Sequence, residues 1–484
     1  MSTSIVWFRT DLRLDDNLSL IAAVRASEQV LPLFVWDPER PTYNSVNRLS
    51  FMIESLQALE ADLKSRGSRL IVRRGEPASV LLDLASETGA TKLFFGRHYE
   101  PYEIARDNRV KETMLANGIE VTTQKESILF EAGEILTKEG KPYTVYTPFK
   151  NSVWPRLRDI PKPIAIPNHL KPHHTINQIE SVDLGGFLPS RSLVAPERQS
   201  GGVLEAEKLW QRFRAFGLGG YAEHRDSVGD QNGTSRIAPH LKFGTISIRR
   251  VLYESLQLLD ASPEMSGAET YIRELLWREF YSNILQAFPH VASGPFQREY
   301  AGLKWSNNEE HFTLWCEGRT GVPIVDAAMR ELLQTGYMHN RARMIVASFL
   351  VKDLQINWQL GELHFMKHLT DGDLAQNNGG WQWTASTGTD AQPYYRIFNP
   401  YLQSKKFDAD GVYIRRYVAE LRPLPSSLIH EPHLMTPFEQ AEHGITIGED
   451  YPLPIVDHYL AREKTKAMYD AVRKLRYSGD RKER

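Results

Sequence analysis

Short apolar runs alternate with helix-like stretches along the first 125 or so residues, and this alternation then stops. The runs typical of strands are residues 5–8, 30–36, 70–72, 93–95 and 119–121. Helical periodicity falls between them, near residues 17–27, 48–66, 78–88 and 103–117. Strands that alternate with helices predict βαβ units and a parallel sheet. We therefore expect an α/β domain over residues 1–130.

The remaining chain follows two other patterns. Prolines and Gly-Gly pairs interrupt any regular element between residues 155 and 202, which predicts a long connection on the surface. After about residue 204, helical periodicity dominates. A chain of 484 residues exceeds one ordinary core, so separate domains are expected. The predicted division is residues 1–130 as the α/β domain, 131–203 as the linker and 204–484 as a helical domain.

Composition excludes several classes of protein. A single cysteine, Cys316, rules out an internal disulfide and a thiolate metal cluster. The sequence has no run of about 18 apolar residues and no apolar leader, so neither a membrane span nor a signal peptide is expected. A net charge of −2 gives no global signal for nucleic acid. We expect a cytoplasmic protein without a metal site.

The stretch Asp371–Ser386 concentrates groups that are typical of a binding site. Its sequence, DGDLAQNNGGWQWTAS, combines two carboxylates, adjacent amides, a Gly-Gly pair and two tryptophans. No apolar stripe with helical spacing runs through it, so a core helix is not expected here. Glycines allow close approach of the backbone, and the indole rings can stack on an aromatic ligand. The alternative is a glycine-rich loop with structural tryptophans.

A predicted helix near residues 267–288 has two different faces. Its core face repeats apolar residues at i, i+4 spacing: Ile272, Leu276, Phe280 and Ile284. The second face places Glu274, Trp277, Arg278 and Tyr281 together. Charges beside a tryptophan are typical of a cavity wall, whereas the alternative is a salt-bridged surface with one amphipathic ring.

Two shorter motifs add polar groups. Asn340 and Met344 are i, i+4 neighbours at the start of another predicted helix, and Arg343 has candidate partners in Asp371 and Asp373. Residues 232–238, NGTSRIA, suit a phosphate at a helix N-terminus, or a plain Ser/Thr cap. Known nucleophile, zinc-protease and phosphate-loop motifs are missing. A cofactor is therefore expected to perform the difficult step of any reaction.

Taken together, these segments resemble the photolyase/cryptochrome family, and specifically class I cyclobutane pyrimidine dimer (CPD) DNA photolyases. The matching motifs follow the family's order and span nearly the whole chain. They are residues 6–14 (VWFRTDLRL), 146–150 (YTPFK), 233–236 (GTSR), 274–281 (ELLWREFY), 320–330 (TGVPIVDAAMR), 337–344 (YMHNRARM), 371–386 and 396–400 (RIFNP).

The resemblance implies a Rossmann-like antenna domain, a long linker and an all-helical domain that binds FAD. It assigns FAD contacts to Tyr221, Thr234, Ser235, Arg236, Ile237, Ala238, Tyr271, Arg278, Arg343, Asp371, Gly372, Asp373 and Asn377. Asn377 is expected to face flavin N5. Ala238 and Tyr271 depart from the serine and the tryptophan that are common at these positions.

The same resemblance implies light-driven repair of CPDs in UV-damaged DNA, by electron transfer from excited reduced FAD to a flipped-out dimer. Lesion contacts are assigned to Glu274, Trp277, Asn340, Met344 and Trp383, and conduction of electrons from the surface to Trp381, Trp358 and Trp305. The expected DNA contacts are Arg225, Glu274, Trp277, Arg278, Tyr281, Asn340, Arg341, Trp383, Arg396 and Gln403. A monomer is expected.

Two other activities of the family remain as alternatives. A (6-4) photolyase is expected to need titrating histidines at the lesion, where this sequence has Asn340 and Met344. Cryptochrome photosensors often replace the amide at Asn377 and carry a long C-terminal extension, whereas this chain has a short basic end. CPD repair is therefore preferred over both, although some sensors retain most of this pocket.

A second, light-harvesting chromophore is also implied. Arg48, Glu100 and Lys242 resemble the members that hold 8-hydroxy-5-deazaflavin between the two domains, although His98 stands where an acid would strengthen the match. Methenyltetrahydrofolate at Glu103, or FMN in the deazaflavin pocket, are the alternatives.

Overall fold

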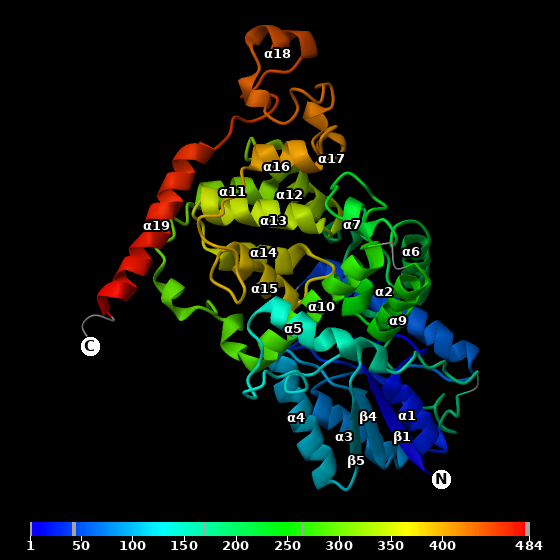
Figure 1. The fold of residues 1–484 in the computed structure, drawn as a ribbon. Helices are drawn as coiled ribbons and strands as arrows, with labels where there is room; N and C mark the ends of the chain where they lie inside the picture. Colours follow the sequence, from blue (N-terminus) through cyan, green and yellow to red (C-terminus); the bar gives the residue numbers. More distant parts are fainter. Residues whose placement is uncertain (1, 41–44, 169, 263–265, 480–484) are drawn as a thin grey trace.

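The computed structural model describes residues 2–40, 45–168, 170–262 and 266–479. A parallel sheet with its helices forms one end of the molecule, and a larger helical region covers the carboxyl edge of that sheet (Figure 1). None of the helices in the described part combines the length and the apolar character needed to cross a bilayer. No group of three or more His, Cys, Asp or Glu side chains in these ranges is placed to hold a metal ion.

The sheet confirms the α/β prediction. Its strands run parallel in the order β3-β2-β1-β4-β5. They are β1 (Thr3–Phe8), β2 (Gln29–Trp36), β3 (Ile71–Arg74), β4 (Lys92–Gly96) and β5 (Glu120–Gln124). Ile5 lies between Leu31 of β2 and Leu93 of β4. The strand order reverses between β1 and β4, which is where ligands of such sheets commonly bind.

Helices cover both faces of the sheet because successive side chains of a strand point to opposite sides. Val6 and Phe8 pack in one buried cluster with α1 (Leu18–Ala26) and α2 (Val46–Ser65). Ile5 and Trp7 pack in another with α3 (Pro77–Thr88) and α4 (Pro101–Ala116). These helices match the predicted ranges.

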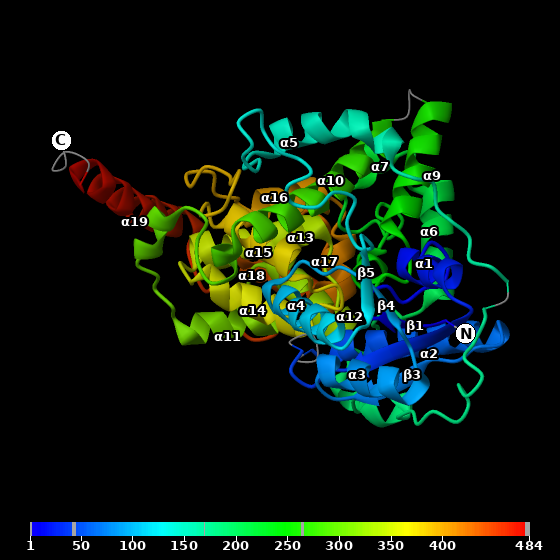
Figure 2. The same cartoon turned by 90° about the horizontal axis from the view of Figure 1, so that it is seen from below.

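Among the described residues, the helical region contains three further buried clusters. Its helices are α6 (Val203–Phe216), α7 (Tyr221–His224), α8 (Ala238–Lys242), α9 (Ile248–Ala261), α10 (Ser266–Ala287), α11 (Glu309–Glu317), α12 (Pro323–Thr335), α13 (Asn340–Ser348), η7 (Phe349–Asp353, a π-helix), α14 (Trp358–His368), α15 (Leu374–Thr384), α16 (Pro400–Phe407), α17 (Val412–Tyr417), α18 (Pro437–His443) and α19 (His458–Gly479). Figures 1 and 2 show α19 projecting from the side of this region.

The connection between the two regions takes part in the helical core. It includes α5 (Tyr146–Val153), and both Tyr146 and Phe149 pack in one cluster with α6, α9 and α10. Later, the connection returns to the sheet, where Ile166 and Leu170 join the cluster of α1 and α2. The connection is therefore partly helical and packs against both regions.

One expectation about secondary structure is wrong. Residues 374–384 form the helix α15, although the segment lacks an apolar stripe. Asp373 caps its first turn by accepting from the Gln376 N–H, at 3.3 Å. The buried amide of Asn378 donates to Glu362 Oε1 at 3.0 Å and to Val291 O at 2.9 Å. Hydrogen bonds to neighbouring elements therefore replace the apolar stripe on the inner face of this helix.

Candidate functional site

A cavity of about 480 Å³ lies between α10, α13, α14 and α15. The residues that line it are Arg225, Ala238, Leu241, Lys242, Glu274, Trp277, Arg278, Tyr281, Asn340, Arg343, Met344, Ala347, Phe365, Leu369, Asp371, Gly372, Asp373, Gln376, Asn377, Gly380, Trp381, Trp383 and Thr384. We call this space the main cavity. Its volume falls in the range of about 300–1,000 Å³ that small-molecule sites occupy.

Helix α10 supplies one wall. Glu274, Trp277, Arg278 and Tyr281 all line the main cavity, while the opposite apolar face is buried in the core. The predicted division of this helix into two faces is confirmed. Glu274 accepts a hydrogen bond from Arg225 Nη1 at 2.6 Å, so the carboxylate is held by a cation of α7's C-terminal end.

Helix α13 supplies the opposite rim. Asn340 Nδ2 lies 3.9 Å from Met344 Sδ, as their i, i+4 spacing predicts. Arg343 Nη2 donates to Asp371 Oδ2 at 2.7 Å, which confirms one of its two candidate partners. Asp371 Oδ1 is buried and has no hydrogen-bond partner among the described residues. The site therefore retains an acceptor for a ligand that donates a hydrogen bond.

Helix α15 contributes most of the floor. A side chain added at Gly380 would meet nothing within 4 Å, so this glycine keeps the cavity open. Gly379 acts differently, because a Cβ there would come within 2.3 Å of the Tyr281 ring. Asn377 Nδ2 donates to Glu362 O at 3.0 Å, which leaves the side-chain oxygen of this amide for the cavity.

Lys242 joins the two regions of the molecule at the cavity wall. Its ammonium donates to Glu100 Oε1 of the α/β region at 2.7 Å and to Asp373 Oδ2 at 2.8 Å. Burial opposes the charge of Lys242, but Asp373 and Glu100 outweigh it and raise the lysine pKa. Burial likewise opposes the charge of Asp373, and Lys242 lowers the carboxyl pKa below its usual value. Both groups are therefore charged at neutral pH.

Several predicted FAD contacts lie outside the lining of the main cavity. They are Tyr221, Thr234, Ser235, Arg236, Ile237 and Tyr271, whereas Ala238 lines it. Tyr271 is buried and donates to Ser235 Oγ at 3.0 Å. Arg236 adopts a positive φ of 55°, and its buried Nε has no partner among the described residues. Their part in binding a cofactor stays a prediction.

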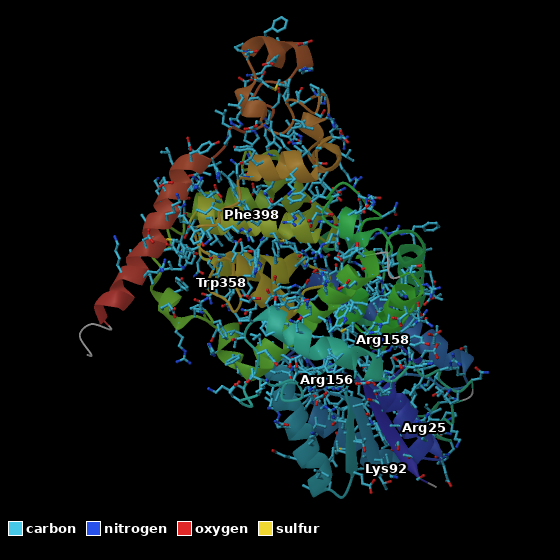
Figure 3. The ribbon with its side chains drawn as sticks, viewed as in Figure 1. Arg25, Lys92, Arg156, Arg158, Trp358 and Phe398 are labelled. Atoms are coloured by element: carbon cyan, nitrogen blue, oxygen red, sulfur yellow. The ribbon has the colours of Figure 1, made fainter. Side chains whose placement is uncertain are left out.

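Of the three residues of the predicted tryptophan chain, Trp381 alone lines the main cavity. Trp381 lines the cavity and is buried, Trp358 (labelled in Figure 3) is buried on α14, and Trp305 is only partly buried against the same core. Trp381 packs edge-on against Phe365 at 5.0 Å and against Trp315 at 6.1 Å between ring centroids. The role of these tryptophans in conducting electrons stays a prediction.

Three of the predicted DNA contacts, Arg341, Arg396 and Gln403, lie outside the lining of the main cavity. Arg341 Nη2 pairs with Asp226 Oδ2 at 2.8 Å, and its guanidinium lies 4.4 Å from the centroid of the Phe407 ring. Arg396 is exposed, and Gln403 is half-buried on α16. Phe398, between these two residues in sequence, lies above α15 in Figure 3.

A second, smaller cavity of about 50 Å³ lies at the seam between the two regions. It is lined by Thr10, Arg40, His98, Tyr99, Glu100, Glu103, Ser127, Ile128, Lys242, Arg278, Ser282, Leu285, Asp373 and Ala375. We call it the seam cavity. Gly244 permits the close approach here, because a Cβ at its φ of 64° would lie 2.2 Å from Thr10 O.

The three predicted antenna residues do not share this cavity. Glu100 and Lys242 line it, whereas Arg48 does not. The Arg48 guanidinium instead donates to Leu369 O at 3.1 Å and to Met366 O, at the C-terminal end of α14. Burial lowers the pKa of Arg48 to about 10, against the opposing effect of Glu100, Asp371 and Asp373. Free helix carbonyls are favourable partners for a buried cation, and they hold Arg48 away from the seam cavity.

Reasoning from the sequence missed several residues of the site. Gln376 and Thr384 line the main cavity and lie inside the stretch that the sequence singled out. Glu362 lies behind Asn377 and Asn378, and burial raises its pKa to about 7. No motif marks Glu362, because its role depends on how α14 packs against α15.

The site fits FAD by the chemistry of its lining. Arg278 and Arg343 provide cations, Asp371 and Asp373 provide acceptors, and Gly380 leaves room beside the backbone. Aromatic and apolar side chains, among them Trp381, Phe365 and Leu369, supply the surface for a flat ring system. Cations beside an apolar floor suit a ligand that joins phosphates to an aromatic group.

Comparison with known proteins supports this fit. Residues 4–168 match the family model described as DNA photolyase, and residues 271–471 match the FAD binding domain of DNA photolyase. A deoxyribodipyrimidine photo-lyase of Escherichia coli is 39% identical, over 98% of this chain and 100% of its own length.

Solved structures agree along the whole chain. A class III photolyase of Agrobacterium tumefaciens has a TM-score of 0.93 at 37% identity and covers 98% of each chain. A Sulfolobus tokodaii photolyase with two FAD molecules has a TM-score of 0.80 at 34% identity, over 97% of this chain and 100% of its own. A Synechocystis cryptochrome has a TM-score of 0.88 at 28% identity, over 97% and 99%. Because one of these relatives is a class III enzyme, class I stays a prediction.

The two family models thus match the two regions that the fold separates, and the FAD model covers the helices that build the main cavity. Full-length identity of 39% to a photo-lyase is well above the level at which only the fold is shared. The chain belongs to the photolyase/cryptochrome family and carries its FAD-binding domain.

Proposed function

We propose that the protein is a deoxyribodipyrimidine photo-lyase that repairs CPDs in DNA with blue light. The observation that carries this proposal is the pairing of Trp277 on α10 and Trp383 on α15 in the lining of one cavity. Glu274, Asn340 and Met344 lie on the same lining. Two indole rings with an acid and an amide suit a flipped pyrimidine dimer, which presents apolar faces and polar edges.

Each residue has a part in binding the lesion. Photolyases are among the enzymes that act on extruded bases, and Trp277 and Trp383 would receive the dimer between them. Glu274 would accept from a pyrimidine N–H, and Arg225 keeps its carboxylate oriented through the 2.6 Å hydrogen bond. Asn340 would bind a pyrimidine edge beside Met344. Arg341, Arg396 and Gln403 would contact the backbone, where charge sets affinity more than sequence.

The reaction itself belongs to the cofactor. FAD, when bound and fully reduced, supplies the electron that splits the dimer under blue light. The protein's residues exclude water, hold the dimer against the cavity and keep Asn377 beside the expected place of flavin N5. Asn377 is a neutral amide fixed by its hydrogen bond to Glu362 O, so it does not force a proton onto that position.

A repair assay with two lesions tests the proposal. Reduced enzyme and blue light should restore a defined oligonucleotide that contains a CPD and should leave a (6-4) lesion intact. The reason is that Asn340 and Met344 do not titrate, whereas (6-4) chemistry needs a proton donor at the lesion. Failure to repair the CPD, or repair of the (6-4) lesion, contradicts the proposal. A photosensor without repair is the second candidate, favoured by the structural likeness to a cryptochrome.

We also propose that the α/β domain, residues 1–130, harvests light through a second chromophore at the seam, with residues 131–203 as linker and 204–484 as the catalytic domain. The candidate is 8-hydroxy-5-deazaflavin held by Lys242 and Glu100. Methenyltetrahydrofolate and FMN remain alternatives, and the Sulfolobus tokodaii relative with two FAD molecules supports a second flavin.

Reconstitution separates these chromophores. Purified protein should take up 8-hydroxy-5-deazaflavin, and Lys242→Ala should weaken its bound absorbance and its energy transfer to FAD. Uptake of a folate alone, or undiminished binding by the variant, contradicts this assignment. We further propose a cytoplasmic monomer, which light scattering on a sizing column and fractionation of cells would check.

A further inference from the structure

We propose that Tyr146 is a positioning residue of the lesion pocket, which holds Trp277 flat against the space that the dimer enters. The inference rests on the proposed function, because it takes Trp277 as a wall of that pocket. Tyr146 is the first residue of α5, in the connection between the two regions. It is absent from the lining of the main cavity, so it acts through another side chain.

Tyr146 and Trp277 form a close parallel stack. Their ring centroids are 3.7 Å apart, and the ring planes differ by 8°. Trp277 lines the main cavity and Tyr146 does not, so Tyr146 covers the face of the indole that is turned away from it. Phe280 and Tyr281 contact the same indole at centroid distances of 5.7 and 5.5 Å. The indole of Trp277 is therefore packed on one face and along its edges, and its other face is turned to the cavity.

The phenol of Tyr146 fixes this stack to the backbone. Tyr146 Oη donates to Arg273 O at 2.6 Å. Arg273 lies four residues before Trp277 on α10, so the same carbonyl accepts the helical N–H of Trp277. This hydrogen bond thus links Tyr146 to the helical turn that carries Trp277. A rotation of Trp277 would have to displace a ring with only 8% exposure and a satisfied hydroxyl.

The backbone of Tyr146 is hydrogen-bonded to the loop that follows α15. Its N–H donates to Asp390 Oδ2 at 3.0 Å, and Thr389 Oγ1 donates to the carbonyl of Thr144. Asp390 lies a few residues beyond Trp383, in the loop that follows α15, and holds a positive φ of 45°. One short segment of the linker therefore contacts both α10, which carries Trp277, and the loop that follows the helix of Trp383.

A purely structural role is the competing interpretation, because Tyr146 also packs edge-on against Phe280 at 5.9 Å. The two interpretations differ in what they predict for DNA. A loss of core packing lowers stability and affects every DNA equally. A loss of Trp277 positioning affects only DNA that places a lesion against Trp277.

The test compares Tyr146→Leu with Tyr146→Phe in FAD-loaded protein. Leucine keeps an apolar side chain but removes the stack, whereas phenylalanine keeps the stack and loses only the hydroxyl. Dissociation constants are measured for an oligonucleotide with one CPD and for its undamaged counterpart. We expect Tyr146→Leu to weaken binding of the damaged strand about two- to tenfold, the value of an aromatic pair, with undamaged DNA unchanged. Tyr146→Phe should stay within about twofold of the wild type.

A double-mutant cycle adds a measurement that a general loss of core packing would not change. In a Trp277→Ala background, Tyr146→Leu should cause no further loss on damaged DNA, because the ring that it positions is gone. Equal losses on both DNAs, or a full additional loss in this background, overturn the inference. Tyr146→Met takes the place of the leucine variant if that protein is purified without FAD.

The outcomes also separate this inference from the proposed function. If the wild type binds damaged and undamaged DNA equally, the proposed function falls and this inference falls with it. If the wild type discriminates and Trp277→Ala loses the discrimination while Tyr146→Leu keeps it, only the inference is overturned.

Discussion

The main cavity and the seam cavity share one wall, yet their volumes are about 480 and 50 Å³. In the seam, ion pairs line the space: Arg40–Glu103 at 3.4 Å and Lys242–Glu100 at 2.7 Å. In the main cavity, Gly380 leaves its side open and aromatic rings form the walls.

The difference follows from how the charges are satisfied. A buried charge needs a partner, and where only protein can supply it the side chains close on one another. The main cavity instead leaves Asp371 Oδ1 without a partner among the described residues. The helical region is therefore already shaped for a ligand, whereas a chromophore at the seam has to displace existing ion pairs.

The largest effect is expected at the boundary of the main cavity. Trp381→Phe should bind FAD but lose its photoreduction, because Trp381 is the member of the predicted chain that lines the cavity. Absorbance of the flavin under blue light with an external reductant measures this loss. Trp210→Phe, in the other core of the helical region, is the control and should photoreduce normally. Photoreduction of Trp381→Phe at the rate of the wild type would show that the path begins elsewhere.

A substitution of Lys242, in the wall that the two cavities share, tests whether they depend on each other. Lys242→Met removes the cation between Glu100 and Asp373, and loss of one partner of a buried pair costs about 3–5 kcal/mol. We expect a lower free energy of unfolding in urea and a lower FAD content after purification. Lys64→Met, which breaks an exposed i, i+4 pair with Glu60, should change the free energy by less than about 1 kcal/mol. Similar changes in the free energy of unfolding for the two variants would contradict the role of Lys242 in joining the two regions.

Measuring stability as a function of pH distinguishes Glu362, a buried carboxyl without a cation beside it, from the carboxylates of the seam, which are paired with cations. Burial raises the pKa of Glu362 to about 7 from the usual 4.5, while the hydrogen bond from Asn378 opposes the shift. The folded state thus favours the protonated acid. Its contribution to stability is complete below pH 4.5 and is lost as the pH rises through about 7.

Glu362→Gln removes that dependence. Relative to the wild type, this variant should gain stability between pH 5 and 8, by up to about 3 kcal/mol. Urea denaturation at each pH measures the difference. Glu60→Gln, which removes a partly exposed carboxylate of α2, serves as the control. A flat difference for Glu362→Gln would show that the carboxyl is ionised in the folded protein.

The lesion wall gives a moderate effect that depends on the DNA. Trp277→Ala should lose about 1–3 kcal/mol of stacking on CPD-containing DNA and little on undamaged DNA. Dissociation constants for both DNAs at one salt concentration measure it. Equal losses on the two DNAs would place Trp277 outside the pocket and would remove the functional contrast between the cavities.

The smallest effect is expected at the rim. Arg341→Ala should weaken the binding of damaged and undamaged DNA to the same extent. The slope of the logarithm of the binding constant against the logarithm of the salt concentration should fall in magnitude by roughly 0.9, the value for one phosphate contact. The ion pair with Asp226 limits the loss, because it already neutralises part of the charge. A selective loss on damaged DNA would instead assign Arg341 to the lesion pocket.

Local patterns in the sequence predicted much of the α/β region and one wall of the site. Strands β1, β2 and β4 follow apolar runs that are buried on both faces of a parallel sheet, so their signal does not depend on partners far away in the chain. The two faces of α10 likewise follow from spacing within one helix. The assignment of cofactor and lesion contacts came from the resemblance, and their roles at Tyr221, Arg236 and Tyr271 are still predictions.

The sequence by itself determined where strands and helices alternate, which face of α10 carries Glu274 and Trp277, and the family to which the chain belongs. Tertiary structure alone decided that residues 374–384 are helical, because the stabilising hydrogen bonds of Asn378 come from Glu362 and Val291. It also decided that Arg48 binds the carbonyls at the end of α14 and that Tyr146 stacks on Trp277. Spacing along a chain records periodicity within one element, whereas these contacts join residues that only packing brings together.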